Sequence, residues 1–164
     1  MPNPKSKIQN PKSKTVATNR RASHDYELLE RFEAGLVLMG TEIKAIRAHQ
    51  VNLQRSFVEN RDGELWLVEA HIAPYEHGRR DGHDPDRPRK LLLHRREINK
   101  IISKLAEKGL TVVPTRLYLS DGRAKVEIAL ARGKKQYDKR AALAKKEADR
   151  QVERALRKKY GYDE

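Results

Sequence analysis

Residues 116–130 read RLYLSDGRAKVEIAL, two runs of alternating apolar and polar residues that meet at the Asp-Gly pair 121–122. Such a pair is typical of two-residue hairpin turns, because both central positions of the turn need a positive φ angle. Residues 56–70, SFVENRDGELWLVEA, repeat this arrangement around the Asp-Gly pair 62–63. The sequence therefore predicts two antiparallel hairpins.

Two further strands are predicted outside the hairpins. Residues 26–39 alternate with a period near two, which is typical of a long strand, and Gly35 within them predicts a bulge or bend. The phrase LTVVP at 110–114 predicts a separate short strand. The face of the long strand expected to pack inward consists of Tyr26, Leu28, Phe32, Ala34, Leu36 and Leu38.

Two helices are expected between the strands. Thr41 is a candidate cap for a short helix in residues 42–50, EIKAIRAHQ. Aliphatic residues recur at i, i+3, i+4 and i+7 in residues 98–105, and Gly109 closes this second helix. Paired strands outnumber helices, so the predicted class is mainly β: a small antiparallel barrel of the oligonucleotide-binding type, flanked by about three helices.

Positive charge is concentrated at the two ends of the chain. The 164 residues carry a formal charge of +13, and residues 1–23 contain six basic residues and no acidic one. We expect residues 1–16 to form a disordered basic arm, because they are too polar to fold alone, and residues 17–132 to form the barrel. Residues 133–164 hold 11 basic and 6 acidic residues. They predict a tail that is disordered when free and helical when bound.

Composition excludes several classes of protein. The chain has no cysteine, which excludes disulfide scaffolds and thiolate sites. No apolar run approaches the roughly 18 residues of a membrane span, and no secretory signal is evident, so we expect a soluble cytoplasmic protein. The loop that contains His77, His83, Asp84 and Asp86 lacks fixed ligand spacing, which favours a solvated loop over a metal site. No catalytic motif appears either, and we expect no cofactor and no enzymatic activity.

Basic clusters that include aromatic residues indicate a nucleic-acid partner. Arg and Lys neutralise phosphates, whereas Tyr and His stack on unpaired bases. One cluster ends the N-terminal arm, a second surrounds three leucines, and a third opens the tail. The candidate RNA-binding residues in these clusters are Asn19, Arg20, Arg21, His24, Tyr26, Arg89, Lys90 and Arg132.

The longest phrases resemble those of one known family. NRRASHDYELLERFEAGLVLMGTEIKAIR at 19–47, HDPDRPRKLLLHRREI at 83–98 and ARGKKQYDKR at 131–140 resemble the small protein B family, the SsrA-binding proteins of bacteria. The resemblance covers about residues 17–157. It implies an oligonucleotide-binding-type barrel with flanking helices.

The resemblance also implies partners and site residues. Members of the family bind the tRNA-like domain of transfer-messenger RNA and deliver it, with elongation factor Tu and GTP, to stalled 70S ribosomes for trans-translation. The protein replaces the missing anticodon arm in the decoding centre. Family RNA contacts fall on Asn19, Glu33 and Leu92. The tail motif, expected in the empty mRNA channel of the 16S rRNA, falls on Gly133, Lys134, Lys135, Asp138, Lys139 and Arg140, with Tyr137 in a stacking position.

Two other interpretations stay open on residues alone. Basic tails also suit a ribosomal or assembly protein that is permanently embedded in rRNA, which would be present in every subunit rather than in a fraction of them. A nuclease or RNA-modifying enzyme is the other alternative, and it would alter RNA when magnesium is supplied.

Overall fold

The structure, a computed structural model, describes residues 13–75, 82–134 and 136–160. The chain divides into two compact units, Met1–Gly133 and Lys134–Glu164. The first contains the sheet and three helices, and the second contains one long helix.

The first unit is built on one seven-stranded sheet in which all pairings are antiparallel. A second, two-stranded sheet joins β3 (Val51–Asn52) to β6 (His71–Ile72). In spatial order the strands of the large sheet are β1 (Ser13–Thr18), β8 (Leu110–Ser120), β9 (Arg123–Gly133), β2 (Tyr26–Leu36), β7 (Arg89–Leu92), β5 (Glu64–Val68) and β4 (Phe57–Arg61).

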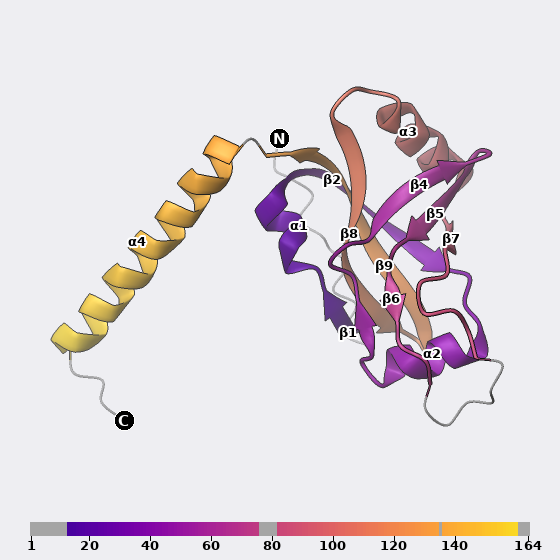
Figure 1. Cartoon of the computed structure of the whole chain (residues 1–164), viewed down its shortest axis with the longest axis horizontal. Helices are drawn as coiled ribbons and strands as arrows, with labels where there is room; N and C mark the ends of the chain where they lie inside the picture. The colour runs from indigo at the N-terminus through magenta and orange to yellow at the C-terminus, as the bar shows by residue number, and fades with distance from the viewer. Residues whose placement is uncertain (1–12, 76–81, 135, 161–164) are drawn as a thin grey trace. The chain divides into compact units, whose positions relative to one another are not determined.

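The predicted mainly β class with flanking helices is confirmed. Three helices accompany the sheet: α1 (Arg20–Asp25), α2 (Gly40–Arg47) and α3 (Arg95–Leu105). The sheet curls, and Figure 1 shows β4 passing close to β8. In the described residues, however, the hydrogen-bonded order runs from β1 to β4 without joining its two ends. The sheet is therefore a curled, incompletely paired barrel.

Both predicted hairpins form where the Asp-Gly pairs lie. Asp62 and Gly63 have φ angles of 52° and 82°, and Asp121 and Gly122 have φ angles of 50° and 74°. Positive values at both central positions fit the twist of the flanking strands. The second hairpin joins β8 to β9, two strands of eleven residues each, which form the longest pairing in the sheet.

The bulge of β2 lies elsewhere than predicted. Gly35 pairs regularly with Leu92 and Lys125, whereas the register shifts between Leu28 and Glu30. This shift reverses the phase of the strand. Strict alternation predicts Tyr26 and Leu28 in the main core. In the structure both pack in a small second cluster instead.

The strand predicted at 110–114 and the first arm of the following hairpin are one strand. β8 runs through Pro114, and its register against β9 shifts between Pro114 and Arg116. A bulge accommodates a proline within a paired strand, because the local ladder is already interrupted there. Thr115, at the bulge, donates its hydroxyl to the backbone and the carboxylate of Glu127.

The N-terminal boundary also differs from the prediction. Residues 13–16, expected in a disordered arm, belong to β1, which pairs with β8. Backbone pairing orders them although their side chains are mostly polar. Residues 1–12 of the expected arm lie outside the described residues.

Helix α2 begins one residue before the predicted cap. Its N-cap is Met39, whose N–H donates to the Glu42 carboxylate at 2.9 Å, while Thr41 hydrogen-bonds His83 instead. The predicted second helix is confirmed as α3, and Gly109 follows it with a φ angle of +83°.

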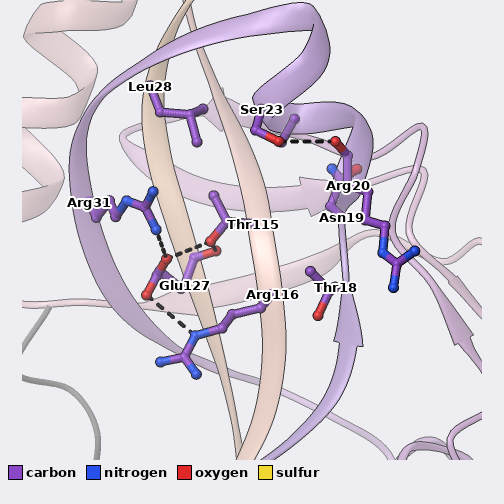
Figure 2. Close-up of a pocket in the computed structure, with 10 residues that line it drawn as sticks. Thr18, Asn19, Arg20, Ser23, Leu28, Arg31, Thr115, Arg116 and Glu127 are labelled. Carbon is purple, nitrogen blue, oxygen red and sulfur yellow. Dashed lines mark hydrogen bonds and ion pairs between the residues drawn. The ribbon is translucent and has the colours of Figure 1, made fainter. Parts of the chain in front are cut away.

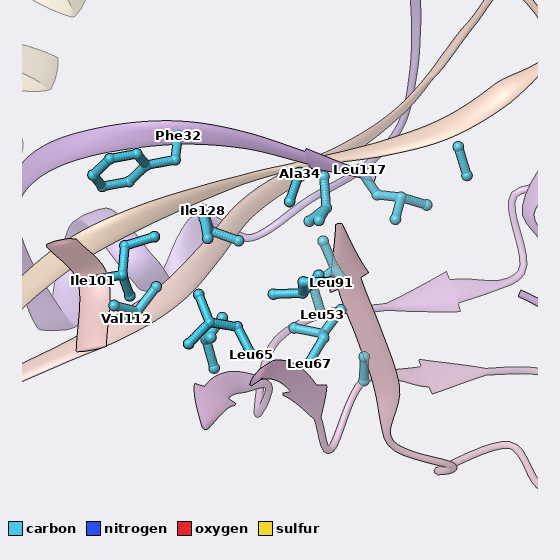
Figure 3. Close-up of a cluster of buried hydrophobic side chains, with 14 of the residues drawn as sticks. Phe32, Ala34, Leu53, Leu65, Leu67, Leu91, Ile101, Val112, Leu117 and Ile128 are labelled. Carbon is cyan, nitrogen blue, oxygen red and sulfur yellow. The ribbon is translucent and has the colours of Figure 1, made fainter. Parts of the chain in front are cut away.

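The core lies inside the curl of the sheet, covered by α3 and α2. Figure 3 shows aliphatic side chains from β2, β5, β7, β8 and β9 converging there. Ile98 and Ile101 add the buried stripe of α3, as the spacing predicts. Most aliphatic side chains of the first unit are committed to this interior, so its outer face is free to carry polar residues.

Candidate nucleic-acid interface

Asn19 lies at the junction of β1 and α1, buried against β8. Its backbone N–H donates to Thr115 O at 2.7 Å, and its side-chain Nδ2 donates to Pro114 O at 2.9 Å. Only 6% of the residue is exposed, and Oδ1 is buried without a hydrogen-bond partner among the described residues. The sequence predicts Asn19 as an RNA-contact residue, and in the structure its side chain also fixes the position of α1.

A hollow of about 380 Å³ opens beside Asn19 and is floored by Glu127. Figure 2 shows Arg31, Thr115 and Arg116 directed at the Glu127 carboxylate, with contacts of 2.8, 2.7 and 3.4 Å. Burial acts to raise the pKa of Glu127, but the hydrogen bonds from Thr115 and Arg31 and the two guanidinium charges outweigh it, and the pKa lies below its ordinary value. The floor of the hollow therefore carries a fixed negative charge under two arginines.

Arg116 connects this hollow to Glu33. Its guanidinium lies 4.6 Å from the ring centroid of Tyr118, whose hydroxyl donates to Glu33 Oε2. Lys125 Nζ lies 3.7 Å from the other carboxylate oxygen. Glu33 is partly exposed, with 34% of its side chain accessible. Both of its oxygens are oriented by the protein while the group stays open to solvent.

Gly35 follows Glu33 on the same face of β2, and it pairs with Leu92 of β7. Leu92 is 52% exposed, which is high for a leucine in a paired strand. A Cβ atom added to Gly35 would come within 3.3 Å of the Leu92 Cβ. Glycine at position 35 therefore leaves the space in which Leu92 lies over the sheet.

These contacts form a continuous outer band across β8, β9, β2 and β7. We use the name outer band for Asn19, Arg31, Glu33, Leu92, Arg116, Tyr118, Lys125 and Glu127. Pairing places Glu33 opposite Glu127, and Gly35 opposite both Lys125 and Leu92. The band thus brings together the three family-implied residues, Asn19, Glu33 and Leu92. Arg20 lines the same hollow as Asn19, and Lys90 lies two residues from Leu92 on β7.

Other predicted residues lie on different surfaces. Arg21 and Tyr26 line a second hollow of about 310 Å³ on α1, together with Arg55 and Phe57. His24 is exposed and contacts Asp25 at 2.9 Å. Arg132 is also exposed, and in the strand register it lies opposite Glu27 of β2.

Arg89 is wrongly predicted as an RNA-binding residue. Its side chain is fully buried, and its Nε donates to Glu42 Oε2 at 2.6 Å. Its remaining donors reach the backbone oxygens of Ala70, Asp84 and Pro85. A guanidinium that is enclosed and hydrogen-bonded in this way cannot approach a phosphate, and it holds the loop before β7 to α2.

The tail residues are described mainly by their backbone. Gly133 ends β9, and helix α4 (Gln136–Tyr160) includes residues 137–140. Arg140 is exposed, and Lys134 is partly exposed. Lys135 lies outside the described residues. Leu143, Val152 and Leu156 of α4 are exposed.

Arg31, Arg116, Tyr118 and Lys125 belong to the outer band but were not candidates. Period-two alternation in residues 116–130 places Arg116 and Tyr118 on one face. The Asp-Gly turn then sets Lys125 and Glu127 opposite them. Counting basic clusters along the chain missed this set, because its members are separated by apolar residues.

The histidine-containing loop is part of the fold where it is described. His83 is buried and hydrogen-bonds Thr41 Oγ1 at 2.8 Å and the Ile72 backbone oxygen at 2.9 Å. His71 is exposed and contacts Asp86 at 3.0 Å. His77 lies outside the described residues.

None of the helices in the described segments is long and apolar enough to cross a membrane.

Comparisons with known proteins point to one family. A sequence model described as "SmpB protein" matches residues 16–158. An SsrA-binding protein of Desulforudis audaxviator is 56% identical over 146 residues, which cover 89% of this chain and 95% of the relative. That of Carboxydothermus hydrogenoformans is 54% identical over 147 residues, covering 90% and 99%. A solved structure described as "tmRNA-SmpB: a journey to the center of the bacterial ribosome" is similar with a TM-score of 0.63 and 51% identity, over 73% of this chain and 85% of that one.

Proposed function

The chain belongs to the SmpB family, and from this premise we propose that it is a non-enzymatic RNA-binding adaptor of trans-translation. It binds the tRNA-like domain of transfer-messenger RNA and delivers it to stalled ribosomes. Elongation factor Tu with GTP joins through the RNA. The protein works in the cytoplasm, where its ribosomal partner is found.

The outer band is the observation that supports an RNA-binding surface on the first unit. It combines cations for phosphates, an oriented carboxylate for base amino groups and an exposed leucine for apolar base or sugar faces. A protein that recognises only charge needs no carboxylate at the centre of its interface. Glu33, tied to Tyr118 and Lys125, supports a surface that reads base edges as well as phosphates.

We assign direct RNA contacts to Arg20, Glu33, Lys90 and Leu92, and a positioning role to Asn19. Arg20, Lys90 and Leu92 present side chains that are at least partly accessible, and Glu33 retains free lone pairs. Asn19 acts through its position: it holds α1 and thereby Arg20 at the hollow. Arg21, His24, Tyr26 and Arg132 are assigned a weaker, peripheral contribution.

The second unit is assigned to the ribosome. Helix α4 is exposed at every position for which a side chain is described, and its last turn holds Arg157, Lys158 and Lys159. A helix with this charge and so little apolar surface suits a channel walled by rRNA. Residues 133–140 then occupy the decoding centre, and the rest of α4 occupies the empty mRNA channel.

The proposal is tested by isolating the protein from cells and sequencing the RNA that copurifies. Transfer-messenger RNA should be enriched over rRNA and tRNA. In vitro, affinity for a tRNA-like-domain transcript should fall steeply with salt, because several phosphate contacts release counterions. Equal recovery of all ribosomal RNA, at one copy per subunit, would instead show a ribosomal structural protein.

A further inference from the structure

Next to the outer band, three strands place a row of side chains on the same face of the sheet. Val37 follows β2 and donates its backbone N–H to Lys90 O at 3.0 Å. On the other side of β7, Trp66 of β5 pairs with Lys90. Val37, Lys90 and Trp66 therefore stand side by side, with Leu92 two residues from Lys90 along β7. We call these four residues the platform.

Burial of the alternating residues shows that the platform faces outward. Leu65 and Leu67 flank Trp66, and both are fully buried in the core. On β7, Arg89 and Leu91 are likewise buried. The platform residues alternate with this buried set, so they lie on the opposite face of the sheet.

The platform is apolar except for Lys90, and it remains accessible. Val37 is 45% and Leu92 is 52% exposed, and Trp66 and Lys90 are half-buried. Neighbouring strands lie about 4.8 Å apart, so the row spans about 10 Å, and alternate residues add about 7 Å along β7. One nucleobase with its ribose covers a surface of this size. Such a platform takes a flat ring against Trp66 and a sugar face against Val37 and Leu92.

The charges around the platform favour a nucleic acid as its occupant. Lys90 at the centre supplies an ammonium group, and the nearby acids are engaged by cations. Glu64 contacts Arg95 at 2.8 Å and Lys90 at 3.9 Å, and its pKa is lowered chiefly by the hydrogen bond from Arg95. Glu59 contacts Arg61 at 3.1 Å. A phosphate near Lys90 would thus meet no unpaired carboxylate from these residues.

We propose that Val37, Lys90, Leu92 and Trp66 form a stacking platform for one unpaired nucleotide of the bound RNA. This inference rests on the proposed function, because the platform continues the surface that Glu33 and Leu92 present. Gly35, between Glu33 and Val37 on β2, leaves no side chain to separate the two. An RNA strand that contacts Glu33 can therefore extend over Leu92 onto Trp66. Base stacking on an aromatic side chain tolerates any base, so the platform contributes affinity rather than sequence choice.

Trp66 is the only tryptophan in the chain, so its fluorescence reports on the platform directly. The experiment titrates the full-length protein with a tRNA-like-domain transcript, while a fluorophore on the RNA reports binding by anisotropy. Trp66 emission should be quenched as RNA is added, and the quenching should saturate at the same RNA concentration as the anisotropy. Acrylamide should quench the indole less in the complex than in the free protein. Trp66→Ala should weaken RNA binding by about 5- to 150-fold, the range expected for one stacked base, and Trp66→Phe should restore most of that loss.

Leu29→Ala is the matched control, since Leu29 is an exposed apolar residue of β2 at the distant bulge and should leave affinity unchanged. Binding by anisotropy with unchanged Trp66 emission and accessibility would overturn the platform and leave the proposed function intact. Shielding of Trp66 only after elongation factor Tu or ribosomes are added would assign the surface to one of those partners rather than to the bound RNA and also overturn the proposal. Absence of any binding by anisotropy would contradict the proposed function itself.

Discussion

The hydroxyl of Tyr118 on β8 donates a hydrogen bond to Glu33 on β2, across the intervening strand β9. Tyr118 is 1% exposed and is covered by the Arg116 guanidinium. Burial, followed by the hydrogen bond to Glu33, raises the pKa of Tyr118 well above its ordinary value. The phenol is therefore a permanent donor, and it holds one carboxylate oxygen of Glu33 in place.

Tyr118→Phe should reduce affinity for the tRNA-like domain by about fivefold, because a single hydrogen bond contributes about 1 kcal/mol. The ring remains under Arg116, so the thermal midpoint should change little. Tyr75→Phe, which keeps its ring near Lys44, is the control. In a Glu33→Ala background the Tyr118→Phe change should have no further effect on affinity. An equal loss in that background would mean that Tyr118 acts on binding independently of Glu33.

Glu33→Ala and Asn19→Ala should separate recognition from folding. Both should weaken RNA binding in an anisotropy titration. Glu33 is partly exposed, so water can replace its carboxylate as the acceptor of the Tyr118 hydroxyl, and Glu33→Ala should change the unfolding free energy little. Asn19→Ala removes the buried hydrogen bond to Pro114, so this variant should also lose about 1 kcal/mol of unfolding free energy. Urea unfolding of both variants measures this difference, and equal stabilities would contradict the structural role of Asn19.

Gly35→Ala should weaken RNA binding by displacing Leu92. The added methyl group meets the Leu92 Cβ at 3.3 Å, closer than most Cβ contacts in proteins, so Leu92 must move by a few tenths of an ångström. We expect a loss in affinity smaller than that of Leu92→Ala, with an intact cooperative melt. Wild-type affinity of Gly35→Ala would show that the position of Leu92 is not critical.

The hairpins and α3 could be predicted from sequence because their signals are local. Asp-Gly turns and aliphatic spacing need no information from distant residues, and both were confirmed. The bulge of β2 could not be predicted, because it depends on the pairing of β2 with β9. Gly35 predicts a bend from sequence. In the structure it instead leaves room for Leu92, a residue 57 positions away on β7.

The candidate site was predictable only in part, because local sequence signals do not show which strands lie side by side. Lys90 and Arg89 are adjacent and equally basic, but strand alternation sends one outward and buries the other against Glu42. A count of basic residues cannot separate them, whereas the strand phase can. Tyr118 and Arg116 were missed because their relation to Glu33 exists only after β8, β9 and β2 are side by side.

Stability should fall in acid because two buried carboxylates have lowered pKa values. For Glu42 and Glu127 burial acts to raise the pKa, but hydrogen bonds and arginine charges outweigh it, and the folded pKa lies below the unfolded value near 4.5. Their stabilisation is therefore complete above about pH 5 and is lost as pH falls through the lower, folded pKa. Urea unfolding between pH 7 and pH 3 should show this decline.

Glu127→Gln tests that assignment. The neutral amide weakens the contacts with Arg31 and Arg116, so the variant should be about 1–3 kcal/mol less stable at pH 7. Its deficit should shrink toward pH 3, where the wild-type carboxylate also becomes protonated. A constant deficit at all pH values would mean that Glu127 contributes by shape rather than by charge.

Removal of the tail should separate RNA binding from ribosome function. The main core lies entirely within Met1–Gly133, so a chain that ends at Arg132 should fold and bind the tRNA-like domain with near wild-type affinity. It should fail to support dipeptide formation with alanyl-transfer-messenger RNA on ribosomes that have an empty decoding site. The reason is that the basic residues of α4, which are exposed wherever a side chain is described, supply the electrostatic attraction for an rRNA channel. Replacing Asp138, Lys139 and Arg140 with Ala should give the same separation in the full-length chain. Wild-type peptide transfer by the Asp138, Lys139 and Arg140 variant would show that the tail acts only as a nonspecific anchor and has no role in the decoding centre.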